Sequence, residues 1–258
     1  MSTGPQTPPG EIVNWPMLKI KYDTDPSAIA KLLPPGIEPG TKPTVTITIY
    51  NFPILNEPEF GYVISVDAIC DGVEGEYQLC NGIDQEAPVQ SCQERWGQPK
   101  FIAETQYYRM IDTVTAKCTH QGYTFLEFTG KVTGVDEDAG DVVTNDWWVK
   151  FSRSVDMMPG KYDLPPKVVH VRSEFGTAHQ EILDGELTLR ESPWDPIATL
   201  LPIKSEVKSV LWTPVFKDRQ YADYKQLDGE AFWPFTETIS GSRWPGLCGT
   251  PIKKLSTQ

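Results

Sequence analysis

The chain has 258 residues, a formal net charge of −12 at pH 7 and a pI near 4.7. Its length allows one large domain with a sizeable core, and its negative charge argues against a nucleic-acid partner, which clustered Lys and Arg would have to bind. The five cysteines lack CxxC spacing, no 18 apolar residues occur in a row, and the first residues form no basic or apolar leader, so we expect a cytoplasmic protein with reduced thiols and no membrane partner.

The first segments of the chain predict an arm, a strand and a helix. Residues 1–10 are rich in Pro, Gly, Ser and Thr and have little to bury, which predicts a flexible arm. The sequence WPMLKIKY (15–22) alternates apolar and polar residues, as a half-buried strand does. Residues 25–33 predict a short helix with Asp25 as N-cap and Pro26 at the first helical position, ended by the Pro-Pro-Gly of residues 34–36.

Beyond this helix the sequence has mostly a two-residue period, which predicts strands. The segments with this pattern are 44–52, 61–70, 75–80, 100–112, 113–119, 123–134, 146–155, 167–176 and 185–192. So many strands predict a large antiparallel sheet, and closure into a barrel would best remove its exposed edges. The expected fold class is therefore β-rich α+β, with a barrel-like core and a few short helices.

The C-terminal part is less regular. Residues 201–227 predict a strand followed by a C-terminal helix, and residues 228–258, rich in Trp, Pro, Gly and Ser, predict a loop or packing arm. We expect residues 11–258 to form a single domain, with 228–258 as its C-terminal extension.

Lys100 is the candidate catalytic residue, because it follows Gly-Gln-Pro and precedes an apolar Phe-Ile-Ala. On a strand, Lys100 would share one face with Ile102 while Phe101 would face the other way. A lysine directed into a closed apolar interior loses hydration in its charged form, and a free amine can attack a carbonyl group to form an iminium. The alternative is an outward lysine with its stem over apolar neighbours and its ammonium in water.

The segment QERWGQPK (93–100) resembles the Pro-Lys signature of the acetoacetate decarboxylase superfamily, whose lysine forms a Schiff base with the substrate. Further resemblance lies in residues 21–39, in GEYQLC (75–80), in DWWVKF (146–151) and in residues 185–204. It covers about residues 12–225 in order. The resemblance implies a barrel-like fold, a lysine Schiff base at Lys100 and a homo-oligomer.

The resemblance also identifies positions that would surround the substrate. The pocket arginine of the family falls at or near Trp15, its two pocket acids fall near Thr48 and near Ile64 or Ser65, and a tyrosine before the Pro-Lys becomes Gln98. These replacements imply an apolar, hydrogen-bonding pocket that favours a larger or less charged carbonyl compound.

Three further positions have both a functional and a structural interpretation. Glu94, retained in the signature, is either a proton-transfer partner of Lys100 or half of a structural salt bridge. Tyr221 and Tyr224 lie near the place where some relatives have a catalytic tyrosine that would shuttle protons, but packing of a terminal helix is the favoured explanation.

Other chemistry finds little support in the sequence. The three histidines are far apart and have no metal-ligand spacing, so we expect no metal. Serine-nucleophile, nucleotide and dinucleotide motifs are missing from the sequence, and we expect no cofactor.

Three functions follow from these residues. The preferred one is a cofactor-free lyase in which Lys100 forms a Schiff base with an oxo acid and a carbon–carbon bond is cleaved by decarboxylation. The second uses the same iminium for an aldol condensation or retro-aldol with dehydration. The third is a β-barrel that binds an apolar ligand without catalysis. The expected partner is in each case a small molecule, a carbonyl substrate for the two enzymatic functions.

Overall fold

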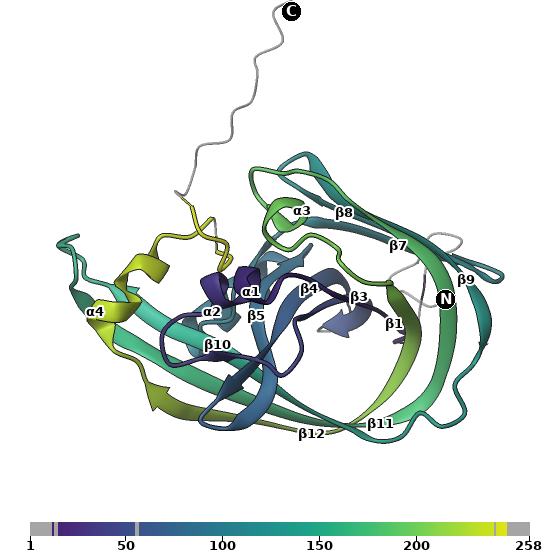
Figure 1. Ribbon diagram of the computed structural model, residues 1–258, viewed down its shortest axis with the longest axis horizontal. Helices are drawn as coiled ribbons and strands as arrows, with labels where there is room; N and C mark the ends of the chain where they lie inside the picture. The colour runs from purple at the N-terminus through teal and green to yellow at the C-terminus, as the bar shows by residue number, and fades with distance from the viewer. Residues whose placement is uncertain (1–11, 13–14, 55–56, 240, 247–258) are drawn as a thin grey trace, which may run out of the picture.

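The computed structural model of the protein describes residues 12, 15–54, 57–239 and 241–246 (Figure 1). The strands are β1 (Met17–Asp23), β2 (Glu38–Pro39), β3 (Thr44–Ile54), β4 (Glu57–Cys70), β5 (Val73–Ile83), β6 (Lys100–Ile102), β7 (Glu104–Met110), β8 (Thr113–His120), β9 (Tyr123–Val135), β10 (Val142–Arg153), β11 (Tyr162–Leu189) and β12 (Lys208–Gln226). The helices are α1 (Pro26–Leu32), α2 (Glu86–Trp96), α3 (Ile197–Leu200), α4 (Gly229–Phe232) and the 3₁₀ helix η1 (Trp233–Thr236).

The strands form one large sheet that closes on itself. Its order is β10-β5-β4-β3-β1-β12-β11-β9-β8-β7, and a further pairing of β10 with β11 joins the first seven strands of this order into a ring. The predicted barrel-like, β-rich fold is thus confirmed. The sheet is mixed rather than purely antiparallel, because β5 pairs in parallel with both β10 and β6. In Figure 1, β7, β8 and β9 extend the ring at one end, and the long β11 and β12 form its lower wall.

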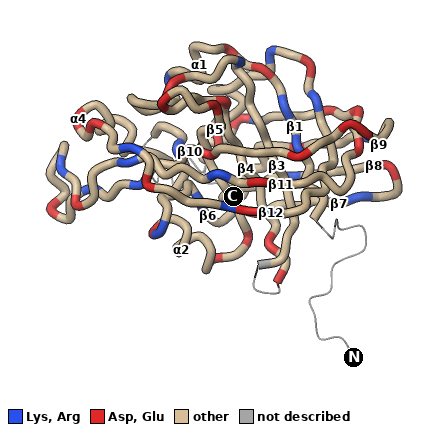
Figure 2. The backbone as a smooth tube through the Cα atoms, turned by 90° about the horizontal axis from the view of Figure 1, so that it is seen from below, with Lys and Arg blue, Asp and Glu red and all other residues tan. Residues whose placement is uncertain are grey.

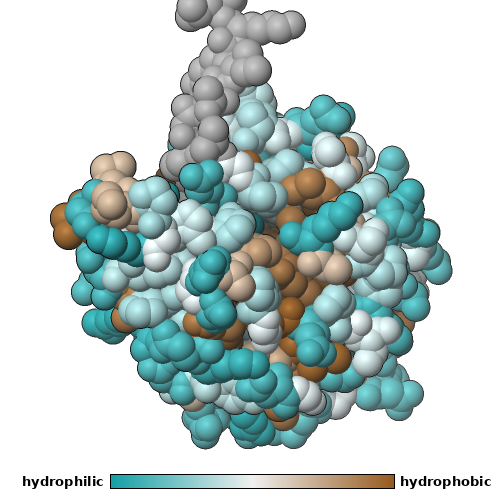
Figure 3. Space-filling view, turned by 60° about the vertical axis from the view of Figure 1, so that its left-hand side comes forward, coloured by the Kyte–Doolittle hydropathy of each residue, from teal (hydrophilic) through white to brown (hydrophobic). Residues whose placement is uncertain are grey.

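The ring and the elements packed on it share a large apolar core. In β1, the side chains of Leu18, Ile20 and Tyr22 are buried, while the alternate residues are more exposed. Helix α1 packs Ile29 and Leu32 into this core. Each buried Leu or Ile of this kind stabilises the fold by about 1.5–3 kcal/mol relative to an exposed position. On the face in Figure 3, a band of hydrophobic side chains is bordered by hydrophilic ones.

The predicted helix at residues 25–33 is confirmed as α1. Asp25 is at the N-cap position and Pro26 begins the helix, although the Asp25 side chain makes no capping hydrogen bond. After the two prolines, Gly36 has a φ of 97°, which favours glycine. The Pro-Pro-Gly segment therefore ends the helix as the sequence predicts.

The C-terminal helix predicted within residues 201–227 is wrong. This stretch forms β12, which pairs with β11 from Lys167↔Gln226 to Leu183↔Ser209, so Tyr221 and Tyr224 lie on a strand. Backbone pairing with the 28-residue strand β11 outweighs the local helical tendency of this segment, which is rich in Asp, Lys and Gln. The packing arm predicted after residue 228 is present in part as α4, η1 and a segment that buries Trp244 completely.

Charges of both signs are interleaved along the chain (Figure 2). Within the described residues, no helix combines the length and the apolar character needed to cross a membrane.

Candidate active site

Lys100 begins β6, directly after a tight connection from α2. Helix α2 ends at Gly97, whose φ of 68° is left-handed and therefore favours glycine. A Cβ at Gly97 would lie 2.5 Å from the carbonyl oxygen of Val149, so the connection also passes very close to β10. Gln98 and Pro99 are buried, and Lys100 follows with only 6% of its surface exposed. The alternative of an outward lysine with its ammonium in water does not fit this burial.

The amine of Lys100 lies beside a buried carboxylate. Its Nζ is 3.5 Å from Oε1 of Glu59 on β4, and the Glu59 side chain is completely buried. Oε1 also accepts a hydrogen bond of 2.9 Å from the hydroxyl of Tyr50 on β3. Oε2 of Glu59 has no hydrogen-bond partner among the residues that the structure describes. One oxygen of this carboxylate is thus free to bind another group.

Tyr50 connects this pair to the neighbouring strand. Its hydroxyl lies 3.2 Å from Oδ1 of Asn81 on β5, which pairs in register with Lys100. Burial, and secondly the charge of Glu59, raises the pKa of Tyr50 well above its ordinary value, so the phenol keeps its proton and acts as a donor. Four polar side chains from four strands therefore meet at one buried point: Tyr50, Glu59, Asn81 and Lys100.

The strand register places this cluster on the inner face of the ring. Lys19, Thr48, Val63, Asn81 and Lys100 are successive partners across β1, β3, β4, β5 and β6, so they lie in one row on one face. Phe101 points to the opposite face, where its ring stacks on His120 at 4.3 Å and contacts Tyr62 edge-on. The sequence correctly predicts that residue 101 faces away from Lys100.

Two of the predicted substrate-binding residues lie along this row or join it through aromatic contacts. Thr48 is a half-buried member of the row itself. Trp15 is half-buried with a φ of 74°, and its ring contacts Phe52 edge-on at 5.6 Å. Phe52 in turn lies 5.0 Å from the ring of Tyr50, so Trp15 is linked to the cluster through two aromatic contacts.

The other predicted residues occupy different surroundings. Gln98 is buried, and its carbonyl oxygen accepts a hydrogen bond of 2.8 Å from the Lys100 amide. Ser65 donates to a carboxylate oxygen of Glu76 rather than contacting the lysine. Tyr224 packs against Trp147 and His170. Glu94 is exposed on α2, whereas Glu59 supplies the carboxylate at Lys100.

The expectation of an apolar pocket without acids needs correction. Glu59 is such an acid, located on β4 six residues before Ser65, where the resemblance placed the missing acid. Glu76 and Asp146 are adjacent partners on β5 and β10. Burial first, and the charge of Glu76 second, raises the pKa of Asp146 to about 7. The inner face is therefore charged, and the sequence analysis misplaced its acids by a few positions.

The C-terminal segment holds the lysine strand from outside. The backbone N–H of Arg243 donates to the carbonyl of Leu79 at 2.7 Å, and its Nη2 donates to the carbonyls of Gly97 and Val149 at 2.8 and 2.6 Å. A Cβ at Gly241 would lie 3.1 Å from the carbonyl oxygen of Lys100. Two glycines and one arginine thus allow the segment to pack tightly against the start of β6.

A second buried polar pair lies on the opposite face. Nδ1 of His120 is 2.7 Å from Oδ2 of Asp195, and both side chains are almost completely buried. Across residues 12, 15–54, 57–239 and 241–246, no group of three or more His, Cys, Asp or Glu side chains is arranged to hold a metal ion. This pair contacts Phe101 rather than Lys100, so it supports the packing of β6.

Comparison with known proteins gives a family match. The family model described as "Acetoacetate decarboxylase (ADC)" matches residues 1–224. No curated protein matches the chain.

Several solved structures are similar in fold. The acetoacetate decarboxylase of Legionella pneumophila has 19% sequence identity and a TM-score of 0.69, over 88% of this chain and 90% of that one. The enduracididine biosynthesis enzyme MppR complexed with pyruvate has 16% identity and a TM-score of 0.64, over 85% and 93%. An acetoacetate decarboxylase-like enzyme from Sphingomonas wittichii RW1 has 12% identity and a TM-score of 0.65, over 83% and 92%.

Proposed function

Because the chain belongs to the acetoacetate decarboxylase family, we propose that it is a cofactor-free lyase whose Lys100 forms a Schiff base with an oxo acid. The observation that carries this proposal is the amine of Lys100, buried on the inner face of the ring with Nζ 3.5 Å from the Glu59 carboxylate. The preferred reaction is decarboxylation.

The chemistry starts with the attack of the neutral Lys100 amine on the keto carbon. The resulting carbinolamine loses water and gives an iminium, in which the nitrogen carries the positive charge. In a 3-oxo acid the bond between the adjacent carbon and the carboxylate carbon then breaks. Its electron pair forms the carbon–carbon double bond of an enamine, the C=N π electrons move to the nitrogen, and carbon dioxide leaves. Protonation of the enamine carbon and hydrolysis of the iminium then release the ketone and restore the amine.

Glu59 is the proposed proton carrier in place of Glu94. Its Oε1 accepts from Tyr50, so Oε2 is left to take a proton from the Lys100 ammonium before the attack, or from the nitrogen of the carbinolamine after it. The hydroxyl of Tyr50 keeps the carboxylate oriented, and Asn81 in turn contacts that hydroxyl. Desolvation strengthens each of these interactions, because few water molecules can screen charges in so closed a site.

An aldolase or dehydratase that uses the same iminium is the second candidate. One observation favours it specifically: the structurally similar MppR has been solved with pyruvate and with the condensation product of pyruvate and imidazole 4-carboxaldehyde. On this chain the enamine of a pyruvate-like substrate would attack an aldehyde, and loss of water would follow.

Reduction with borohydride tests the Schiff base. With a panel of 2- and 3-oxo acids, we expect the reduced adduct to appear as added mass on the peptide that contains Lys100. The Lys100→Ala variant should neither trap nor turn over substrate, and Lys131→Ala, which removes an exposed lysine of β9, is the matched control. Unchanged turnover by Lys100→Ala would refute both Schiff-base functions, and neither trapping nor turnover by the unmodified chain would leave a ligand-binding barrel.

The two reactions differ in their products. Release of carbon dioxide from an oxo acid alone supports decarboxylation, whereas consumption of an aldehyde together with pyruvate, without carbon dioxide, supports the aldolase. Homo-oligomer formation and a cytoplasmic location remain predictions, to be checked by light scattering and by cell fractionation.

A further inference from the structure

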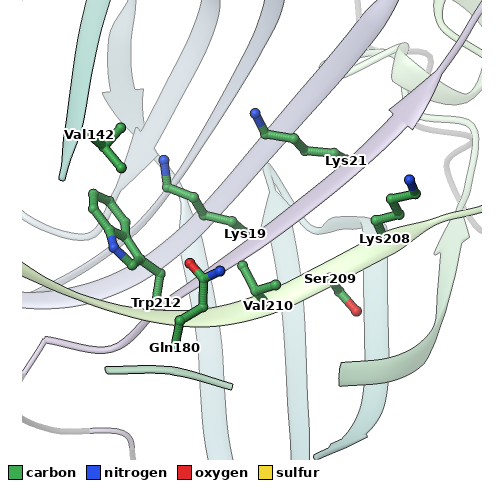
Figure 4. A pocket seen from close by; sticks show the side chains of 8 residues that line it. All are labelled: Lys19, Lys21, Val142, Gln180, Lys208, Ser209, Val210 and Trp212. Carbon is green, nitrogen blue, oxygen red and sulfur yellow. The ribbon is translucent and has the colours of Figure 1, made fainter. Parts of the chain in front are cut away.

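A cavity lies over one face of the paired strands β1 and β12, and neither Lys100 nor Glu59 lines it. Its volume is about 290 Å³ (Figure 4). The residues that line it are Lys19, Lys21, Val142, Gln180, Lys208, Ser209, Val210 and Trp212. Three of these are lysines and none is acidic, although the chain as a whole carries a net charge of −12. A positive cavity in a negative protein is the feature that needs an explanation.

The lysines of the cavity lie close enough for their positive charges to repel one another. Lys21 and Lys208 are direct partners across β1 and β12, and like charges at such positions destabilise a sheet. Lys19 lies two residues from Lys21 on the same face, and Figure 4 shows its side chain between those of Lys21 and Trp212. A bound anion would relieve this repulsion.

The nearby carboxylates do not neutralise all three lysines. Glu76 lies 4.0 Å from Nζ of Lys21, but it also accepts hydrogen bonds from Thr46 and Ser65. Within the described part of the chain, no carboxylate oxygen lies within 4.0 Å of Nζ of Lys19 or Lys208. Two ammonium groups at the cavity therefore have no carboxylate within ion-pair distance, and Glu76 and Asp146 attract Lys19 only from farther away.

The remaining wall is apolar and rigid. Nζ of Lys19 lies 4.6 Å from the centre of the Trp212 ring. The indole is fixed, because its Nε1 donates to Thr177 at 2.9 Å and its ring contacts Phe175 edge-on at 5.4 Å. Burial lowers the pKa of the Lys19 amine, with Glu76 opposing the effect, so a bound anion would favour the charged form.

A neighbouring cavity provides a contrast. It has a volume of about 220 Å³ and shares Lys21 and Lys208, but its lining also includes Asp23 and Glu206. With Lys42, three lysines face two carboxylates there, so most of the positive charge is offset and the preference for an anion is weaker. The cavity over β1 and β12 is also the larger of the two. At about 30 Å³ per water-sized group, it accommodates roughly ten non-hydrogen atoms.

We propose that the cavity over β1 and β12 binds a small organic anion, with its carboxylate at Lys19 and Lys208 and an apolar body against Trp212 and Val210. Lys19 and Lys100 share the inner face of the ring, but β3, β4 and β5 lie between their strands, and neither Lys100 nor Glu59 lines the cavity. It therefore stands whether or not Lys100 forms a Schiff base.

Isothermal titration calorimetry of the full chain with three probes tests the site. Phenylacetate has ten non-hydrogen atoms and both features, phenylacetamide is its neutral isostere, and acetate has the charge without the ring. We expect phenylacetate to bind at least 10-fold more tightly than either of the others. No measurable binding of phenylacetate, or equal binding of the amide or of acetate, would overturn the proposal.

Variants locate the probe in the protein. Lys19→Met and Lys208→Met should each weaken phenylacetate binding about 10-fold, while Lys131→Met, at an exposed position of β9, should leave it unchanged. Lys208 is exposed, so its variant is expected to fold even if Lys19→Met does not. Lys100→Ala should bind phenylacetate as the unmodified chain does. If it loses affinity as Lys19→Met does, the probe occupies the lysine site of β6 and the proposal fails.

Discussion

Replacing Glu59 by Gln should strongly destabilise the protein, because it leaves the Lys100 ammonium buried without its counter-charge. At the 3.5 Å separation of Nζ and Oε1, the Coulomb energy of a unit pair is about 5 kcal/mol at an effective dielectric constant near 20. Removal of one partner of a buried pair costs about 3–5 kcal/mol in other proteins. We therefore expect Glu59→Gln to lower the free energy of unfolding at pH 7 by about 3–5 kcal/mol.

A double-mutant cycle isolates the contribution of the pair. Urea unfolding is measured for Glu59→Gln, Lys100→Met and the double variant. The double variant should be markedly more stable than the sum of the single effects implies, by about 2 kcal/mol or more, since neither charge is then left unpaired. Additive effects, or a cost below 1 kcal/mol for Glu59→Gln, would show that no ion pair exists at Lys100 and would refute the reasoning.

Three further predictions concern other buried polar groups. Burial raises the pKa of Asp146 to about 7, so the stability that its neutral form provides is full below about pH 4 and is lost as the pH rises to 7. Asp146→Asn lacks this loss and should gain on the order of 4 kcal/mol in unfolding free energy relative to the unmodified chain across that range. Parallel pH profiles of urea unfolding for the two proteins would contradict this. Arg243→Met removes the donors to the carbonyls of Gly97 and Val149. It should lower the free energy of unfolding by about 2–3 kcal/mol and slow borohydride trapping at Lys100 several-fold. Trapping at the normal rate would show that the C-terminal segment does not position the lysine. Asp195→Asn weakens the buried hydrogen bond to His120 and should cost about 2 kcal/mol by thermal unfolding, with a melting temperature equal to that of the unmodified chain as the contrary result.

The sequence predicted most strands because their alternation is a local property. In β1 the side chains of Leu18, Ile20 and Tyr22 alternate with polar ones, and the same rhythm defines β3 and β8. Helix α1 was also predictable, since its proline at the start and its Pro-Pro-Gly end act on the adjacent backbone. Helix α2 was missed because it has no buried residues and hence no apolar stripe.

Only part of the candidate site could be predicted from the sequence. The Gly-Gln-Pro-Lys segment singled out Lys100, and strand alternation placed Phe101 on the opposite face. Glu59, however, meets Lys100 only because β4 and β6 both lie next to β5 in the sheet, and no local pattern indicates that contact. Arg243 reaches the same region from the far C-terminal end of the chain for the same reason.

What the sequence by itself determined is therefore most of the strands, the alternation of their faces and the identity of one candidate lysine, because these depend on neighbouring residues. Only the tertiary structure decided that Glu59 and Tyr50 accompany this lysine, that β12 is a strand rather than a helix, and that the inner face is charged. These features depend on pairing between distant strands, where hydrogen bonds and burial outweigh local preference.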